Sequence, residues 1–230
     1  MKPIIGIIMR PGVSETKKET MYAYEQISHT ITSNGGIPIG IIPTTNSYYY
    51  NKKNNETKPL TDQEVKDLYR AIDLCDGLIC QGGDEYYDYD IKAIKYAHMK
   101  NIPLLGICLG MQAMAMAFDG VMEDIENHYK PDLLYAHVVK IKENSILYNI
   151  LKTNIIDVNS RHRSIVTITN LEIVGVCDGV IEAIEDSTKD FFVGLQWHPE
   201  DMIEYDILAN RLFAYFVYKC GGYNDYKKTY

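Results

Sequence analysis

The chain has 230 residues, of which 46% are hydrophobic and 23% are charged, and it carries a formal net charge of −8. This is enough chain, of ordinary globular composition, for one domain over residues 1–230. The acidic balance argues against a nucleic-acid partner, because phosphate contacts need a basic surface, and no stretch is long and apolar enough to predict a membrane association.

The five cysteines are an odd number at irregular spacing, with no C-x-x-C pair and no evident zinc arrangement. The N-terminal apolar stretch is too short for a signal peptide and lacks a small-residue cleavage site. We therefore expect free thiols, a cytoplasmic protein, and neither a metal nor a cofactor.

The first half of the chain alternates short buried strands with helices. Strands are predicted at 4–9, 37–42 and 77–80, and helices at 20–33, 61–74 and 90–100, followed by a strand–turn–helix segment at 102–118. The helix at 61–74 opens on a capping box, Thr61-Asp-Gln-Glu64. This alternation is typical of a parallel sheet with helices on both faces. Its strand-to-helix loops meet at the carboxyl edge of the sheet, where ligands bind.

The second half reads as an antiparallel excursion from that sheet. Short β-branched runs lie at 137–141, 155–158, 165–168, 172–177 and 180–184. Asp178-Gly179 is a hairpin signal between the last two. A further strand is predicted at 191–196 and an amphipathic helix at 203–219, stopped at 221–222. The expected fold class is therefore α/β, with a mostly parallel central sheet and a small antiparallel excursion.

A polar loop is predicted over residues 44–59, and it contains three consecutive tyrosines, Tyr48, Tyr49 and Tyr50. Two interpretations remain open for them. They line a substrate pocket, or they cover one edge of the fold.

The motif Gly106-Ile-Cys108-Leu-Gly110 lies between a buried strand and a helix. It is the G-x-nucleophile-x-G pattern, in which a sharp strand-to-helix turn presents the central side chain and leaves no room for side chains beside it. The helix N-terminus favours a thiolate, and the Leu109 N–H is free to face an oxyanion. We interpret Cys108 as a nucleophile; the alternative is a small buried core residue.

The strand at 77–80 ends at Gly82-Gly83. Paired glycines there let the backbone approach a ligand or turn its N–H groups inward, although a plain tight turn has the same pattern.

A cysteine nucleophile needs a base and a group that orients it. His198-Pro199-Glu200 fits, because proline holds His198 extended and residues two apart then face the same side. The alternative is an ordinary surface pair. His162 is the second candidate base, but the arginines beside it, Arg161 and Arg163, disfavour its protonation and suit a substrate carboxylate better.

Two motifs, Gly106-Ile-Cys-Leu-Gly-Met-Gln112 and Gln196-Trp-His-Pro-Glu200, together resemble the class I glutamine amidotransferases. Further stretches resemble one branch of that superfamily, the γ-glutamyl-γ-aminobutyrate hydrolase-like peptidases (peptidase C26 type). They are Asn34-Gly-Gly-Ile-Pro38, Gly82-Gly-Asp84, Asn101-Ile-Pro-Leu-Leu105, Val158-Asn-Ser160 and Asp178-Gly-Val-Ile-Glu182. The resemblance implies a flavodoxin-like glutamine amidotransferase fold.

The resemblance also implies a Cys-His-Glu triad of Cys108, His198 and Glu200 that forms a thioester with a small-molecule γ-glutamyl substrate. It implies an oxyanion hole at the Gly83 and Leu109 N–H groups. The substrate-binding residues expected from it are Gly82, Gln112, Ser160, Arg161 and His162. The alternative for Gln112 is a helix-surface side chain.

The chain departs from the hydrolase branch at three places. Leu109 replaces an arginine that usually follows the nucleophile, His162-Arg-Ser164 replaces a His-His-Gln run, and tyrosines replace a proline after Gly82-Gly-Asp84. These positions lie near the expected leaving-group site. The sequence therefore predicts a γ-glutamyl amide hydrolase, with a glutaminase subunit that supplies ammonia to a separate synthase as the alternative. A homodimer or a synthase partner is compatible with either, and a catalytically idle binding module is the third possibility.

Overall fold

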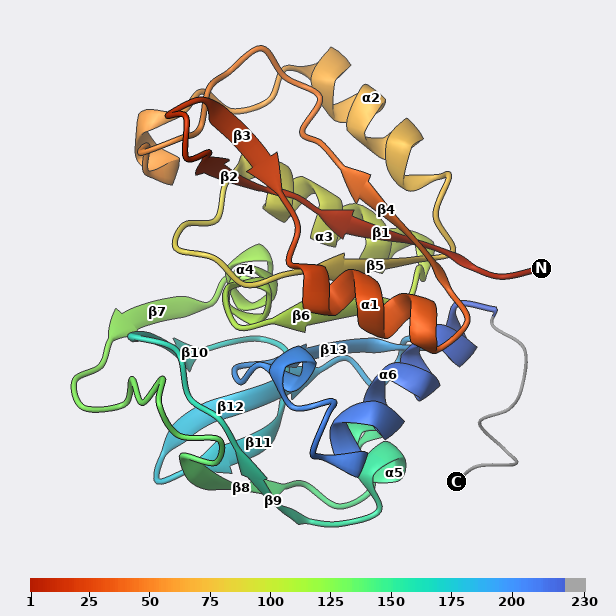
Figure 1. The fold of residues 1–230 in the computed structure, drawn as a ribbon, viewed down its shortest axis with the longest axis vertical. Helices are drawn as coiled ribbons and strands as arrows, with labels where there is room; N and C mark the ends of the chain where they lie inside the picture. The colour runs from red at the N-terminus through yellow and green to blue at the C-terminus, as the bar shows by residue number, and fades with distance from the viewer. Residues whose placement is uncertain (222–230) are drawn as a thin grey trace.

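A twisted eleven-stranded sheet runs through the part of the chain that the computed structural model describes, residues 1–221 (Figure 1). Five of its strands are mutually parallel. In order across the sheet they are β4 (Ile37–Ile41), β1 (Ile4–Ile8), β5 (Gly77–Cys80), β6 (Leu104–Ile107) and β13 (Phe192–Leu195). The apolar runs of the sequence thus form parallel strands, and all of them are buried except the edge strand β4, where only Ile41 is buried.

The sheet continues without a break into an antiparallel half. Next to β13 follow β12 (Val180–Glu185), β11 (Glu172–Cys177), β8 (His137–Ile141) and β9 (Ile155–Val158), while β10 (Ser164–Ile168) joins β12 to β7 (Val121–Asp124). The predicted hairpin between β11 and β12 is confirmed. Asp178 and Gly179 both have positive φ, 47° and 87°, as a two-residue hairpin turn requires.

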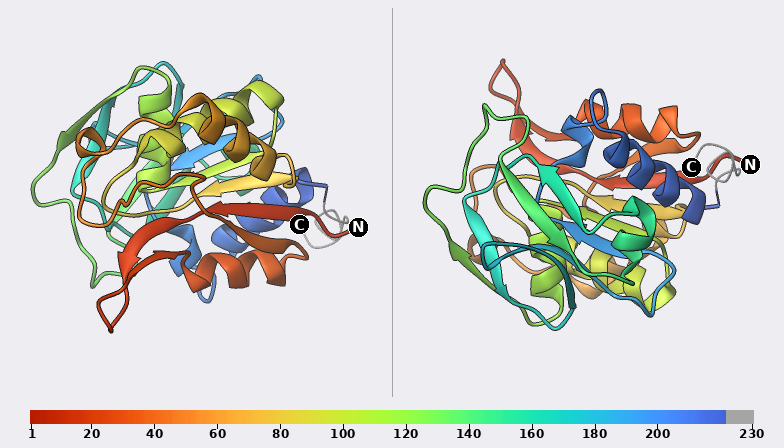
Figure 2. Two further views of the ribbon diagram at one scale, coloured as in Figure 1. Left: turned by 90° about the horizontal axis from the view of Figure 1, so that it is seen from above. Right: turned by 90° about the horizontal axis from the view of Figure 1, so that it is seen from below.

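Helices cover both faces of the sheet, which confirms the predicted α/β class (Figure 2). One face carries α2 (Asp62–Ile72), α3 (Asp88–Lys100) and α4 (Leu109–Ala117), and the other carries α1 (Glu25–Ser33), α5 (Ile146–Leu151) and α6 (Ile207–Lys219). Each face has its own apolar core. The capping box of α2 forms as predicted, with Thr61 and Glu64 bonded reciprocally.

The predicted helix at 20–33 is wrong over its first turn. Residues Glu19–Tyr22 form strand β3, which pairs with β2 (Arg10–Val13), and the helix begins only at Glu25. The hairpin stands outside the main sheet. Pro11 is tolerated in β2 because β2 has no second neighbouring strand that would need a backbone N–H from this position. Pairing with the preceding strand β2 has overridden the helical spacing of the apolar residues.

Other differences concern ends and short elements. The helix predicted from 203 begins at Ile207, because Asp206 caps it by accepting the Leu208 and Ala209 N–H groups. A 3-10 turn, η2 (Pro199–Asp201), precedes it, and another, η1 (Asn54–Glu56), lies in the loop at 44–59. The short elements α5 and β7 were not predicted. Gly222, the second residue of the predicted stop, lies outside the described residues.

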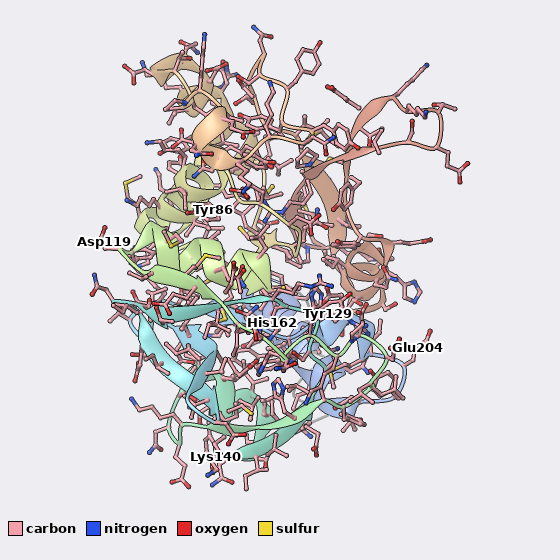
Figure 3. The ribbon with its side chains drawn as sticks, turned by 90° about the vertical axis from the view of Figure 1, so that its left-hand side faces the viewer. Tyr86, Asp119, Tyr129, Lys140, His162 and Glu204 are labelled. Atoms are coloured by element: carbon pink, nitrogen blue, oxygen red, sulfur yellow. The ribbon has the colours of Figure 1, made fainter. Side chains whose placement is uncertain are left out.

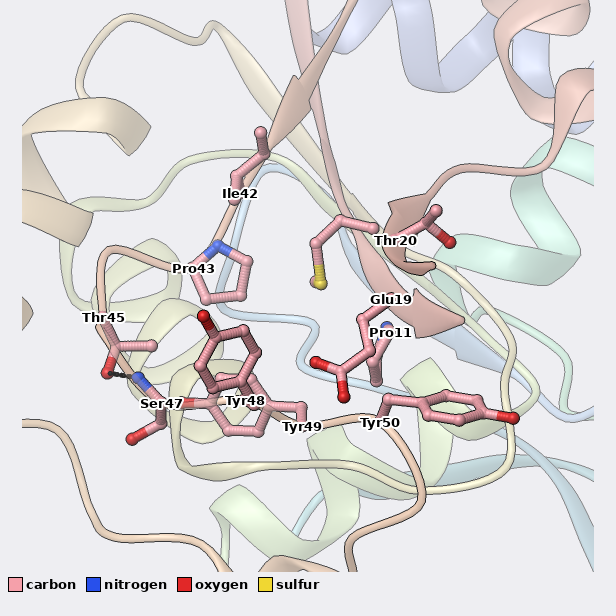
Figure 4. Close-up of a pocket in the computed structure, with 11 residues that line it drawn as sticks. Pro11, Glu19, Thr20, Ile42, Pro43, Thr45, Ser47, Tyr48, Tyr49 and Tyr50 are labelled. Atoms are coloured by element: carbon pink, nitrogen blue, oxygen red, sulfur yellow. Dashed lines mark hydrogen bonds between the residues drawn. The ribbon is translucent and has the colours of Figure 1, made fainter. Parts of the chain in front are cut away.

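The tyrosines of the 44–59 loop lie partly in the interior and partly around a surface pocket. Tyr49 is buried and its ring packs against those of Tyr87 and Tyr89, at centroid distances of 4.7 and 5.2 Å. Tyr48, Tyr49 and Tyr50 also line a pocket of about 210 Å³ against the β2–β3 hairpin (Figure 4). None of the candidate catalytic residues lines this pocket.

All five cysteines are unpaired and buried. Within residues 1–221 there is no helix with the length and apolar character needed to cross a membrane.

Candidate active site

The turn from β6 into α4 holds Cys108 in a strained conformation, with φ 52° and ψ −106° at the N-cap of the helix. Glycine is required on both sides. A Cβ at Gly110 would stand 1.8 Å from the Cys80 carbonyl oxygen, and one at Gly106 would stand 2.4 Å from the Met114 sulfur. The glycines of the motif therefore allow the close approach of α4 to the sheet that the turn needs, as the sequence predicted.

His198 contacts both residues with which the sequence grouped it. Its Nδ1 lies 2.8 Å from Glu200 Oε1, and the Cys108 thiol lies close enough to the same ring to raise its pKa. Burial alone would lower the pKa of His198, but the Glu200 carboxylate and Cys108 outweigh it, so the pKa lies well above its ordinary value. The arrangement can take a proton from the thiol and keep the imidazolium stable.

Asn159, at the end of β9, fixes the backbone of the histidine. Its side-chain amide donates to the His198 carbonyl oxygen at 2.7 Å, and its Oδ1 accepts from the His198 N–H at 2.9 Å. Asn159 is fully buried. The sequence analysis named Asn159 only as part of Val158-Asn-Ser160. It could not assign a role to Asn159, because its hydrogen bonds to His198 span 39 residues.

A buried pair of glutamines lies against the thiol. Gln196 Nε2 approaches Cys108 Sγ at 3.7 Å, and Gln196 Oε1 accepts from Gln112 Nε2 at 3.1 Å. Gln112 also donates to the Ser164 carbonyl oxygen at 2.9 Å. Gln112 is 4% exposed, so it is not a helix-surface residue. It lies in the neighbourhood of the nucleophile, and its contact with substrate stays a prediction.

The Gly82-Gly83 loop lies directly against the cysteine and the histidine. A Cβ at Gly82 would stand 2.8 Å from His198 Cε1 and 3.7 Å from Cys108 Cβ. Gly83 is next to Leu109, since its Cβ would stand 3.2 Å from Leu109 Cδ2. The two residues predicted for an oxyanion hole are therefore neighbours at the carboxyl edge of the sheet.

Arg10 binds the backbone of this loop, and the sequence analysis gave it no role. Its guanidinium donates to the carbonyl oxygens of Gln81 and Gly82, at 2.8 and 3.3 Å, and pairs with Asp90 at 2.6 Å. Both charged side chains are buried. Burial opposes the charge of Arg10, but Asp90 outweighs it and raises the pKa of Arg10 above its ordinary value.

The other predicted substrate residues bind protein groups. Ser160 Oγ donates to the His128 carbonyl oxygen at 2.6 Å, and Arg161 pairs with Asp201 at 2.8 Å. His162, labelled in Figure 3, is buried, and its Nε2 lies 3.7 Å from Glu182 Oε1. No described contact joins these three side chains to Cys108.

The pKa of His162 is lowered, but not by the flanking arginines as the sequence suggested. Its pKa is lowered to about 4, but burial is the largest cause and Glu182 opposes it. The flanking arginines face elsewhere, since Arg161 binds Asp201 and the Arg163 guanidinium lies 3.6 Å above the Tyr129 ring. His162 is neutral because it is desolvated, and His198 is the histidine that contacts the thiol.

The chain is similar in sequence and in fold to several known proteins. A protein of Schizosaccharomyces pombe that is named as a glutamine amidotransferase is 33% identical to this chain over 175 residues. The match covers 62% of this chain and 68% of the relative. A CTP synthase of Methanosphaera stadtmanae is 33% identical over 162 residues, which cover 54% of this chain and 30% of the synthase. The chain thus spans about a third of that enzyme's length.

Among solved structures, a protein of Thermoplasma acidophilum described as one subunit of a GMP synthase superposes with a TM-score of 0.66 at 17% identity. The superposition covers 98% of both chains, which shows a shared fold. Residues 86–200, half of the chain, match the family Peptidase C26, and this range includes Cys108, His198 and Glu200. The family supports a hydrolase acting on C–N bonds. The chain belongs to the Peptidase C26 family, within the class I glutamine amidotransferase superfamily.

Proposed function

We propose that this protein hydrolyses a γ-glutamyl amide, with γ-glutamyl-γ-aminobutyrate or a related γ-glutamyl amine as substrate. The observation that carries the proposal is the contact of the partly buried His198 imidazole with both Cys108 and Glu200, at a strained strand-to-helix turn. This is the geometry of an activated nucleophile, a base and an orienting carboxylate.

In the proposed reaction, the Cys108 thiol first passes its proton to His198, and the resulting thiolate attacks the γ-carbonyl carbon beside the imidazolium. The tetrahedral oxyanion accepts hydrogen bonds from the Gly83 and Leu109 N–H groups. His198 then protonates the leaving amine, and a thioester to Cys108 remains. Water, deprotonated by His198, attacks the thioester and releases glutamate. Glu200 holds the imidazole in the required orientation throughout.

A second function is favoured by two observations. The relatives include a CTP synthase and a component of a GMP synthase, and the nucleophile is followed by leucine and not by arginine. Under this alternative the protein is a glutaminase that delivers ammonia to a separate synthase. Its activity on glutamine would then stay low until that synthase binds.

The experiment that tests the proposal is glutamate release by the purified protein from a panel of γ-glutamyl amines that includes glutamine. We expect cleavage of at least one γ-glutamyl amine without any added protein. If no compound of the panel releases glutamate, while a glutamine-like alkylating agent still labels Cys108, the result would contradict the hydrolase proposal. It would favour the glutaminase alternative.

The orienting carboxylate leads to a prediction about pH. Glu200 raises the pKa of His198, so Glu200→Gln should let the imidazolium lose its proton at a lower pH. We expect the alkaline limb of the kcat/KM profile to move to lower pH and the rate at neutral pH to fall by about 10²- to 10⁴-fold. The matched control is Glu204→Gln, an exposed carboxylate four residues further on. An unchanged alkaline limb in Glu200→Gln would refute the orienting role.

A further inference from the structure

Three histidines and a glutamate converge in the interior beside the candidate active site. Glu182, on β12, is completely buried, and its Oε1 lies 3.1 Å from His128 Nε2, 3.2 Å from His137 Nε2 and 3.7 Å from His162 Nε2. The donor atoms of His128, His137 and Glu182 all lie within 4.8 Å of one another. The catalytic proposal uses none of these side chains as acid, base or nucleophile.

Hydrogen bonding explains only part of this cluster. His128 Nε2 is the one ring nitrogen hydrogen-bonded to Glu182 Oε1 in the described structure. His137 Nε2, His162 Nε2 and Glu182 Oε2 are buried and have no hydrogen-bond partner. Buried polar atoms are rarely left unpaired, and several in one place indicate a missing ion or water.

The spacing fits a metal ion. Ligand atoms about 2.0–2.1 Å from a tetrahedral zinc ion stand roughly 3.3 Å apart, and the three distances to Glu182 Oε1 bracket this value. Two of the three nitrogens approach the carboxylate without hydrogen-bond geometry, as expected for lone pairs directed at a common point. Imidazole and carboxylate ligands suit Zn²⁺ among the common divalent ions.

The surroundings of His162 fit a ligand as well. His162 Nδ1 lies 3.2 Å from the Ser164 carbonyl oxygen, so it donates there and Nε2 carries the free lone pair. The side chains of His128 and His137 remain partly exposed, at 15% and 11%, which leaves a path for an ion.

We propose that His128, His137, His162 and Glu182 form a site for a divalent transition-metal ion, with Zn²⁺ as the expected occupant. The ion would join the connection between β7 and β8 to the connection between β9 and β10. Ser160 already links these two segments through the His128 carbonyl oxygen. The second segment carries Asn159, which brackets the His198 backbone, so the ion would stabilise the support of the candidate base.

The test uses full-length protein without a histidine tag, stripped with a chelator and with its accessible thiols alkylated. It is titrated with Co²⁺ and then with Zn²⁺. We expect one equivalent of Co²⁺ to give the visible absorption of tetrahedral coordination, without a thiolate charge-transfer band. Zn²⁺ should displace it and raise the Tm. Absence of a saturable, tetrahedral Co²⁺ spectrum in the wild type would overturn the proposal and leave the cluster as a hydrogen-bonded network only.

Variants locate the bound ion. His137→Asn and the isosteric Glu182→Gln should weaken Co²⁺ binding by more than the roughly 10- to 100-fold loss that follows removal of an outer-shell partner. His29→Asn, at an exposed histidine on α1, should bind as the wild type does. Unchanged binding in either cluster variant, once circular dichroism has shown that it is folded, would overturn the assignment. Should both variants unfold, the wild-type spectrum decides alone.

Discussion

Cys108→Ser should reduce glutamate release by about 10⁴-fold or more while leaving the free energy of unfolding within about 1 kcal/mol of the wild type. The loss of rate follows from the weaker nucleophilicity of a hydroxyl and from the collective action of the triad, in which removal of the nucleophile alone is nearly as costly as removal of the whole unit. The small effect on stability follows from the near-equal size of the two side chains. The hydroxyl can also replace the thiol in its contacts with His198 and Gln196.

The matched control is Cys220→Ser, which makes the same chemical change in the core under α6. Burial is the largest cause that raises the pKa of this thiol, and the Asp76 carboxylate adds to it. A hydroxyl buried in this core should cost about 1–3 kcal/mol of stability. Activity should be retained. Initial rates and urea denaturation of both variants check the contrast. A large loss of stability in Cys108→Ser, with activity preserved, would mean that Cys108 is a packing residue.

The parts of the site that the sequence predicted are those encoded locally. The nucleophile turn depends on Gly106 and Gly110, whose added Cβ atoms would collide with Met114 and with the Cys80 carbonyl. His198 and Glu200 do meet, but through the 3-10 turn η2 and not along the extended segment that the sequence predicted. Both motifs could be identified from the sequence because each is written within five residues, although Gly110 is required by a contact with Cys80 on a neighbouring strand.

The parts that the sequence could not predict are assembled by the sheet. The histidines that surround Glu182 come from positions 20 to 54 residues away, without ligand spacing, and only the pairing of the antiparallel strands brings them together. The β2–β3 hairpin, whose strands are close in sequence, was missed for a different reason. Its apolar residues repeat at nearly helical intervals, and the pairing of Glu19–Tyr22 with Arg10–Val13 decided the outcome.

Arg10 also makes long-range contacts that the sequence could not predict, to Gly82 and Asp90. Its removal should be strongly destabilising. Arg10→Met leaves the Asp90 carboxylate buried without its partner, which costs about 3–5 kcal/mol. Arg10→Met/Asp90→Asn removes the buried charge. It keeps the Asp90 side-chain oxygen that accepts the Tyr87 N–H, so it should recover most of the stability. Urea denaturation of the single and double variants measures both changes.

The double variant should remain slow even though it is stable. Arg10 binds the Gly82 carbonyl oxygen, and in a trans peptide the Gly83 N–H points the opposite way, so the guanidinium fixes the direction of a proposed oxyanion donor. Misalignment of one such donor costs about 10²- to 10³-fold in kcat with little change in KM. Arg10→Lys should keep the charge but lose the double carbonyl contact, and should fall in kcat too, whereas Arg70→Lys, at an exposed arginine of α2, should not. Full activity in the stable double variant would show that Arg10 serves the fold alone and has no part in orienting the Gly82–Gly83 peptide.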